Sequence, residues 1–138
     1  MLTLVPPVHR ATHRIGLFLA ATRPALGLSQ GEAHLLAELH AAGTSSPGAL
    51  HRAFAHRRST LTGILDRLEE RGLVRRRLRP EDRRSFALEL TPRGRGLAAR
   101  TARRLEALER AVRRRVTAAD LRGFTAVVEA LAEEAGDD

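Results

Sequence analysis

Several residue types are missing from this 138-residue chain, and each absence excludes a class of protein or site. The chain has no cysteine, which excludes disulfides, thiolate metal sites and a cysteine-based redox sensor. It also has no tyrosine or tryptophan, and its aromatic residues are four phenylalanines. The core must therefore be built from Leu, Val, Ile and Ala, which favours packed helices.

Long apolar runs and catalytic signatures are missing as well. No stretch is long enough to span a membrane. There is no nucleophile elbow, glycine-rich phosphate loop, paired-carboxylate signature or His-Glu-x-x-His motif. We therefore expect a non-enzymatic, cytoplasmic protein that does not act at a membrane and needs no cofactor or metal.

Lysine is absent too, so all 24 basic residues are arginine, and their charge is unevenly distributed. Residues 51–104 contain 16 arginines and 6 acidic residues, a balance of +10. The remainder contains 8 arginines and 10 acidic residues, a balance of −2, which together give the net charge of +8. A basic face that is only solvated and a surface that binds phosphate both fit this excess.

Helical spacing of apolar residues and polar capping residues predict helices on both sides of the basic segment. Residues 8–22 have helical spacing, and Pro24 is expected to end that helix. Other helix starts have a capping Ser or Thr, namely Ser29 with Glu32, Ser46-Pro47, Thr91-Pro92, and Thr117 with Asp120. Glycines are expected to end two helices, at Gly43 and Gly72. For the long helix after Pro92 the predicted buried stripe is Leu97, Thr101, Leu105, Leu108, Val112 and Val116.

Two strands are expected between the fourth helix, residues 57–72, and the long helix. The strands are residues 73–79 and 86–90, and residues 80–85 form a charged tip between them. A short helix, a tight turn, an amphipathic helix and a two-stranded hairpin make a winged helix-turn-helix. The predicted class is therefore mainly α with a small β-wing (α+β), with residues 57–72 as the recognition helix.

The sequence resembles the MarR family of transcriptional regulators over nearly its whole length. The resemblance is carried by residues 28–32 (Leu-Ser-Gln-Gly-Glu), residues 59–74, Asp82-Arg83-Arg84 and residues 88–94 (Leu-Glu-Leu-Thr-Pro-Arg-Gly). It implies a homodimer formed by residues 1–26 and 92–138, and a DNA-binding domain over residues 27–91. It also implies a repressor that binds a near-palindromic operator in double-stranded DNA and responds to a small-molecule effector.

The expected DNA contacts fall on the recognition helix and on residues near it. Major-groove contacts are expected from the start of the helix, at Arg57, Arg58, Ser59, Thr60, Thr62 and Gly63. Phosphate contacts are expected at Ser46, His51, Arg67 and Arg77. Asp66 would be repelled by phosphate, so it is expected to pair with a nearby arginine. Arg57 stands where a capping residue is usual, which leaves the helix start less defined.

In the wing, the family pattern makes Asp82 a brace, Arg84 the side chain that enters the minor groove and Arg83 a phosphate contact. A narrow minor groove attracts arginine through its negative potential. A solvated hairpin tip with an Asp–Arg pair is the alternative interpretation of the same residues.

Two further interpretations concern ligands and partners. An effector pocket carried over from the family would involve His13, Leu17, His34 and Glu38. A metal-responsive regulator of the same fold is an alternative, because His9 and His13 have the i, i+4 spacing of a metal edge. A winged helix that binds proteins is the other alternative, although such a domain has no need of a strongly basic central segment.

Overall fold

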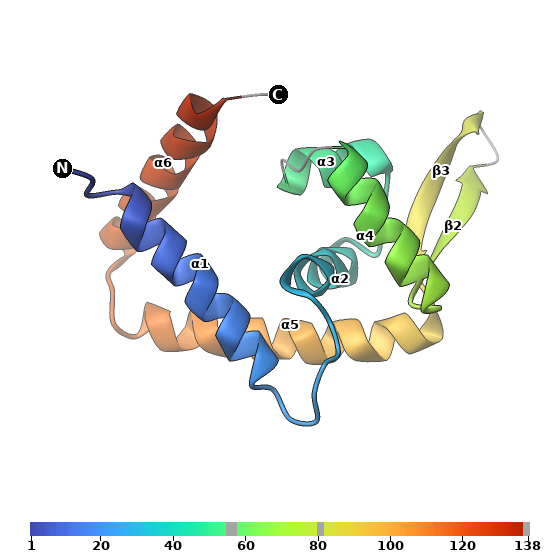
Figure 1. Ribbon diagram of the computed structural model, residues 1–138, viewed down its shortest axis with the longest axis horizontal. Helices are drawn as coiled ribbons and strands as arrows, with labels where there is room; N and C mark the ends of the chain where they lie inside the picture. Colours follow the sequence, from blue (N-terminus) through green and yellow to red (C-terminus); the bar gives the residue numbers. More distant parts are fainter. Residues whose placement is uncertain (55–57, 80–81, 137–138) are drawn as a thin grey trace. The chain divides into compact units, whose positions relative to one another are not determined.

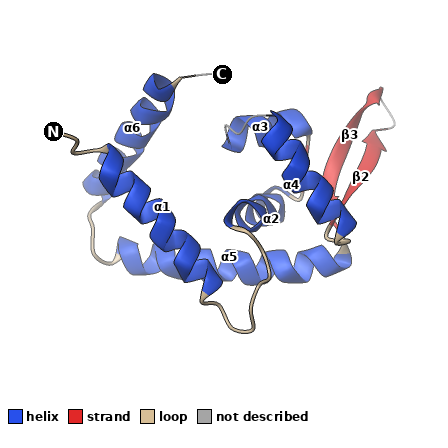
Figure 2. Cartoon of the chain, viewed as in Figure 1, coloured by secondary structure: helices blue, strands red, loops and turns tan. Residues whose placement is uncertain are grey.

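The structure is a computed structural model that describes residues 1–54, 58–79 and 82–136. Its elements, in chain order, are α1 (Val5–Ala20), α2 (Gln30–Ala42), β1 (Thr44–Ser45), α3 (Pro47–Phe54), α4 (Arg58–Glu70), β2 (Val74–Arg79), β3 (Asp82–Leu90), α5 (Pro92–Arg113) and α6 (Ala118–Ala135) (Figure 1). The chain is mostly helical with one small sheet, which confirms the predicted class (Figure 2). It divides into two compact units, residues 1–104 and 105–138, and α5 runs through the division.

The sheet has three antiparallel strands in the order β1-β3-β2. Only β2 and β3 were predicted. The short strand β1 was not, because two residues are too few to show an alternation of apolar and polar side chains. β3 begins at Asp82, so the prediction that residues 80–85 are all tip is wrong for the second part of that segment. A charged hairpin has no apolar alternation from which its outer pairing can be read.

The predicted helix starts of α2, α3 and α6 are confirmed by their capping hydrogen bonds. Ser29 and Glu32 form a capping box at α2, as Thr117 and Asp120 do at α6. At α3 the hydroxyl of Ser46 accepts from the backbone N–H of Ala49 at 3.0 Å. These bonds satisfy donors that a helix start leaves free, so the polar residues define the boundaries locally.

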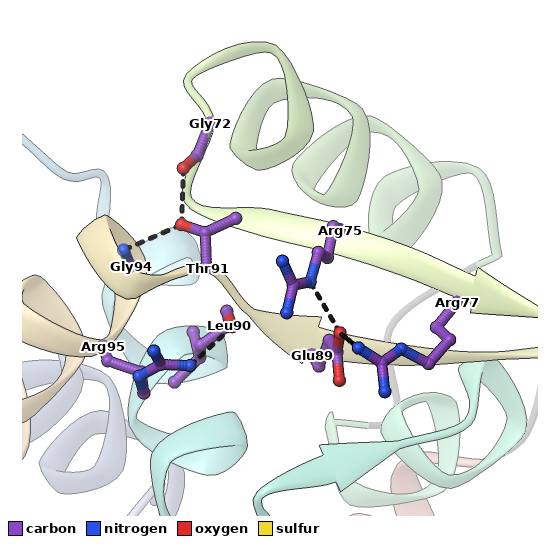
Figure 3. Close-up of polar contacts among 8 residues, drawn as sticks. All are labelled: Gly72, Arg75, Arg77, Glu89, Leu90, Thr91, Gly94 and Arg95. Atoms are coloured by element: carbon purple, nitrogen blue, oxygen red, sulfur yellow. Dashed lines mark hydrogen bonds and ion pairs between the residues drawn. The ribbon is translucent and has the colours of Figure 1, made fainter.

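The exit from α4 and the entry to α5 are joined by one threonine. Gly72 adopts the left-handed conformation (φ +70°) that ends α4, as predicted. The Thr91 hydroxyl donates to the Gly72 carbonyl at 2.6 Å and accepts from the Gly94 N–H at 3.0 Å (Figure 3). A Cβ on Gly94 would lie 1.9 Å from the carbonyl oxygen of Leu73, so this position accepts only glycine without movement of the backbone. The base of the wing is thereby packed directly on the start of α5.

The core lies among α2, α3, α4 and the sheet, and the leucines on the inner faces of α2 and α4 form much of it. Its buried members are Leu35, Leu36, Leu39, Leu50, Leu61, Ile64, Leu65, Leu68, Leu73, Val74, Leu88, Leu90 and Ala98. Burial of such side chains stabilises the fold by about 1.5–3 kcal/mol each.

The predicted buried stripe of α5 is wrong in part. The buried residues of α5 are Gly94, Ala98, Thr101 and Ala102, while Val112 is exposed and Val116 lies beyond the helix end. The side chains of these buried residues are small, which lets a helix approach its neighbours closely. Gly94 on this face lies close to the Leu73 carbonyl, and Leu97 of the predicted stripe is partly buried against the core.

Helix α1 starts and ends earlier than predicted. It begins at Val5 because prolines fit the first turn, where their missing N–H is not needed. It is connected to α2 by a hydrogen bond from the Gln30 side chain to the Thr12 carbonyl at 3.0 Å. Arg104 of α5 donates to the Phe18 carbonyl at 3.2 Å, and its guanidinium lies 3.7 Å from the centre of the Phe18 ring. These contacts hold α1 within the first unit.

The second unit contains the end of α5 and all of α6. Helix α6 has no buried residue, and Phe124, Val127 and Val128 are exposed. In the described part of the chain, no helix has the length and apolar character needed to cross a bilayer.

Candidate nucleic-acid interface

The outer face of α4 carries small polar side chains. Leu61, Ile64 and Leu65 point into the core, whereas Ser59, Thr60 and Thr62 are exposed. All three hydroxyl residues lie in the N-terminal half of the helix, and a Cβ added to the half-buried Gly63 would meet only the end of the Arg67 side chain, at 3.5 Å. Because its side chains are small, this face can approach another surface closely, and its hydroxyl groups can donate and accept hydrogen bonds.

Between α3 and α4 there is a cavity of about 350 Å³. It is lined by Pro47, Gly48, His51, Arg52, Leu61, Thr62 and Leu65. Two of the predicted contact residues, His51 and Thr62, therefore lie on one hollow. The Nδ1 atom of His51 is buried and has no hydrogen-bond partner in the described structure.

The other predicted phosphate contacts differ in their exposure and in the hydrogen bonds or ion pairs that they already make. Ser46 is half-buried and already caps α3, so its hydroxyl has only part of its capacity left. Arg67 is exposed on α4. Arg77 is 66% exposed but pairs with Glu89, the distance from its Nη2 to the Glu89 Oε1 being 3.2 Å. Any phosphate contact by Arg77 must therefore compete with an existing ion pair.

Glu89 pairs with two arginines of the neighbouring strand. Its Oε1 accepts from the Arg75 Nε at 2.6 Å, in addition to the contact with Arg77 (Figure 3). The hydrogen bond from Arg75 is the main cause that lowers the pKa of the Glu89 carboxyl, and the charges of Arg77 and Arg95 lower that pKa further. Glu89 therefore remains ionised through the neutral pH range.

Arg76 connects the wing to α4 from the opposite face of the sheet. Its Nε lies 2.6 Å from the Glu69 Oε1 and its Nη2 lies 3.2 Å from the Asp66 Oδ1. Its guanidinium also lies 4.9 Å from the centre of the Phe86 ring. The prediction that Asp66 pairs with an arginine is confirmed. The partner is on β2, which sequence spacing alone did not identify.

Some predicted contacts lie outside the described residues. Arg57 is one of these, and so are the side chains of Arg58, Asp82, Arg83 and Arg84. The backbone places Asp82, Arg83 and Arg84 at the start of β3, on the outer part of the hairpin.

The four residues of the expected effector pocket lie on two helices of the first unit. His13 and Leu17 are exposed on α1, while on α2 Glu38 is exposed and His34 is half-buried. Partial burial lowers the pKa of His34. Among the described residues no group of three or more His, Asp and Glu side chains is arranged to hold a metal ion.

The geometry of a helix-turn-helix followed by a β-hairpin agrees with what known proteins show. The model of the MarR family matches residues 28–86. These residues are a MarR-family domain. No curated protein matches the sequence significantly.

Solved structures resemble the chain well beyond the MarR-family domain. MepR of S. aureus in its DNA-binding conformation has a TM-score of 0.82 and 16% identity, over 96% of this chain and 98% of that chain. A mutant of MarR from E. coli, complexed with operator DNA, has a TM-score of 0.73 and 20% identity, over 93% and 92% of the two chains. A further MarR structure is 26% identical with a TM-score of 0.70, over 97% and 91%. The helices on both sides of the domain thus belong to the same overall fold.

Sequence reasoning missed the ion pairs of Glu89 with Arg75 and Arg77, but it identified the hydroxyl residues of α4 and an arginine partner for Asp66. Glu89 alternates with the inward-facing Leu88 and Leu90, so its outward position was readable from the sequence. Its partners depend on the register Arg75↔Glu89, which no local pattern specifies.

Proposed function

We propose that the chain is a transcriptional regulator that binds a near-palindromic operator as a homodimer. In this proposal α4 enters the major groove and the β2–β3 hairpin reaches the adjacent minor groove. The observation that carries it is the exposed row of Ser59, Thr60 and Thr62 on α4, next to a hairpin rich in arginine. Short hydroxyl side chains contact base edges, and the basic segment supplies the attraction to phosphate.

Arg84 supplies the sharpest test of the proposed binding mode. Arg84→Ala is expected to weaken operator binding sharply, because it removes the side chain assigned to the minor groove, and to leave the dimer intact. Operator binding is measured by fluorescence anisotropy over a series of salt concentrations, on an operator obtained by binding-site selection from genomic DNA. The plot of log K against log salt should flatten by about one unit for each phosphate that the variant no longer neutralises.

Arg114→Ala is the matched control for Arg84→Ala, because Arg114 is an exposed arginine outside the MarR-family domain. It should leave operator affinity close to that of the wild type. Unchanged affinity of Arg84→Ala at physiological salt would rule out the minor-groove role of this residue.

The homodimer is supported by large apolar side chains that are exposed in the described part of the chain. Val5, Val8 and Leu17 of α1 are 55%, 41% and 56% exposed, and Phe124 of α6 is 62% exposed. Exposed apolar surface of this kind marks an association site in soluble proteins. Two-fold symmetry of the dimer would place two copies of α4 about 34 Å apart, one helical turn of DNA.

Ligand response is the finer part of the proposal. A small-molecule effector that binds near His13, Leu17, His34 and Glu38 would contact α1 and α2 together. Its binding would release DNA if it favours a separation of the two α4 helices that does not match successive major grooves. The regulator is proposed to act as a repressor, because a dimer on an operator blocks access to the DNA it covers.

A further inference from the structure

The outer face of the wing combines one carboxylate with several arginines. The antiparallel register places Arg75 directly opposite Glu89, and Arg77 lies two residues further on the same face of β2. Figure 3 shows both guanidinium groups directed at the same carboxylate oxygen. The distances are 2.6 Å from the Arg75 Nε and 3.2 Å from the Arg77 Nη2.

The three partners differ strongly in exposure. The Glu89 side chain is 14% exposed, whereas those of Arg75 and Arg77 are 50% and 66% exposed. The carboxylate is thus held close to the sheet, and the arginines lie over it with part of each guanidinium facing solvent. A phosphate that approached this face would meet two cations whose charge is already partly neutralised.

The run Arg75-Arg76-Arg77 therefore offers less free positive charge than its sequence indicates. Arg76 lies on the other face of the sheet, where it forms ion pairs with Asp66 and Glu69. Each arginine of the run thus has a protein carboxylate as a partner. Transfer of Arg75 or Arg77 to a phosphate would break one of the two ion pairs of Glu89, and transfer of both would leave its carboxylate, 14% exposed, without a partner, which is costly.

We propose that Glu89 is a specificity-determining residue, which restrains Arg75 and Arg77 and so limits binding to DNA of arbitrary sequence. This inference rests on the proposed function. On the operator, base contacts by α4 fix the position of the protein, and phosphate contacts are confined to those that this position allows. On other DNA the protein is free to take the orientation with most phosphate contacts. Free arginines on the wing would therefore strengthen non-specific binding more than operator binding.

The test compares Glu89→Gln with the wild-type full chain on two duplexes, the selected operator and a scrambled duplex of equal length and composition. The variant should bind the scrambled duplex roughly three- to tenfold more tightly, with a salt slope steeper by about one to two units. Affinity for the operator should rise less, so the ratio of the two affinities should fall. Equal gains on both duplexes, or weaker binding to both, would overturn the proposal.

Glu109→Gln is the matched control for charge. It removes the same charge from an ion pair with Arg113, 3.7 Å long, on α5 and outside the sheet. It should change the ratio of affinities little, and an effect as large as that of Glu89→Gln would assign the result to net charge and overturn the proposal. Arg75→Gln and Arg77→Gln added to Glu89→Gln should remove the gain.

A second variant covers the case in which Glu89→Gln does not fold, as judged by circular dichroism and thermal melting. Arg77→Gln in the wild-type background should flatten the salt slope on the scrambled duplex by less than about half a unit, because Arg77 is restrained by Glu89. A decrease of a full unit would show that Arg77 already binds phosphate and would overturn the proposal. If the wild type itself bound neither duplex, the proposed function would fail. If it bound DNA but Glu89→Gln behaved as wild type, only this inference would fail.

Discussion

Gly94 occupies a position where the fold leaves no room for a side chain. Its backbone packs on the Leu73 carbonyl, at the point where the wing begins. Gly94→Ala should lower the free energy of unfolding by about 1–3 kcal/mol, because the new Cβ forces the start of α5 away from the sheet. Urea unfolding followed by circular dichroism measures this change.

Gly96, two residues further along α5, is the matched control for Gly94. A Cβ at Gly96 would meet nothing within 4 Å. Gly96→Ala should therefore stabilise the chain by up to about 1 kcal/mol, through its better helix propensity. Equal effects of the two substitutions would contradict the packing role of Gly94.

Arg76 illustrates a second kind of residue, one that connects elements. Arg76→Ala should lower the free energy of unfolding by about 1 kcal/mol, since it removes an ion-pair network and a cation–π contact at a partly exposed position. Arg76→Lys should recover little of this, because an ammonium group lacks the fork that reaches both Asp66 and Glu69. A double-mutant cycle with Glu69→Gln measures the coupling directly, and a coupling of zero would contradict the assigned contact.

At the scale of the elements, the sequence predicts best where a boundary is decided by one or two side chains. The start of α2 follows from Ser29 and Glu32, and the end of α4 follows from Gly72, because each of these residues satisfies or terminates the backbone locally. The leucine stripe of α4 was equally readable, since one side of that helix is buried and the other is not.

The buried face of α5 was not predictable in the same way. Its apolar pattern offers a stripe of mostly large residues, of which the structure fully buries Thr101, and it buries Ala98 and Ala102, which were not predicted. Which face is used depends on how close the backbones approach, and that is a property of the partner surface. The pairing of Glu89 with Arg75 and Arg77 was missed for a related reason, because it depends on the register between two strands.

At the scale of the whole molecule, the apolar face of α6 is expected to be covered in solution by a second copy of the chain. Phe124→Glu should shift the protein from dimer to monomer, because it replaces an apolar side chain of the proposed interface, 62% exposed in the single chain, by a charged one. Sedimentation velocity measures the association state, and circular dichroism should show retained helix. Operator affinity should fall in the same variant, because only one copy of α4 remains.

Arg122→Glu is the control for Phe124→Glu. Arg122 is an exposed polar residue on the same helix, so the variant tests whether any new negative charge on α6 is sufficient to shift the protein from dimer to monomer. A variant Phe124→Glu that remained dimeric would contradict the role of α6 in association.

The hydrogen bonds of Thr91 also have a mechanical consequence. One hydroxyl links the turn after α4 to the first turn of α5, so both strands of the wing share a fixed joint with a long helix. A strand of six residues extends about 20 Å from such a joint. A rotation of about 5° at the base would then displace its far end by about 1.7 Å, half of the axial rise between successive base pairs. In the proposed binding mode the wing would act as a lever arm that pivots at Thr91, and small rotations of α5 would misalign it with the DNA backbone.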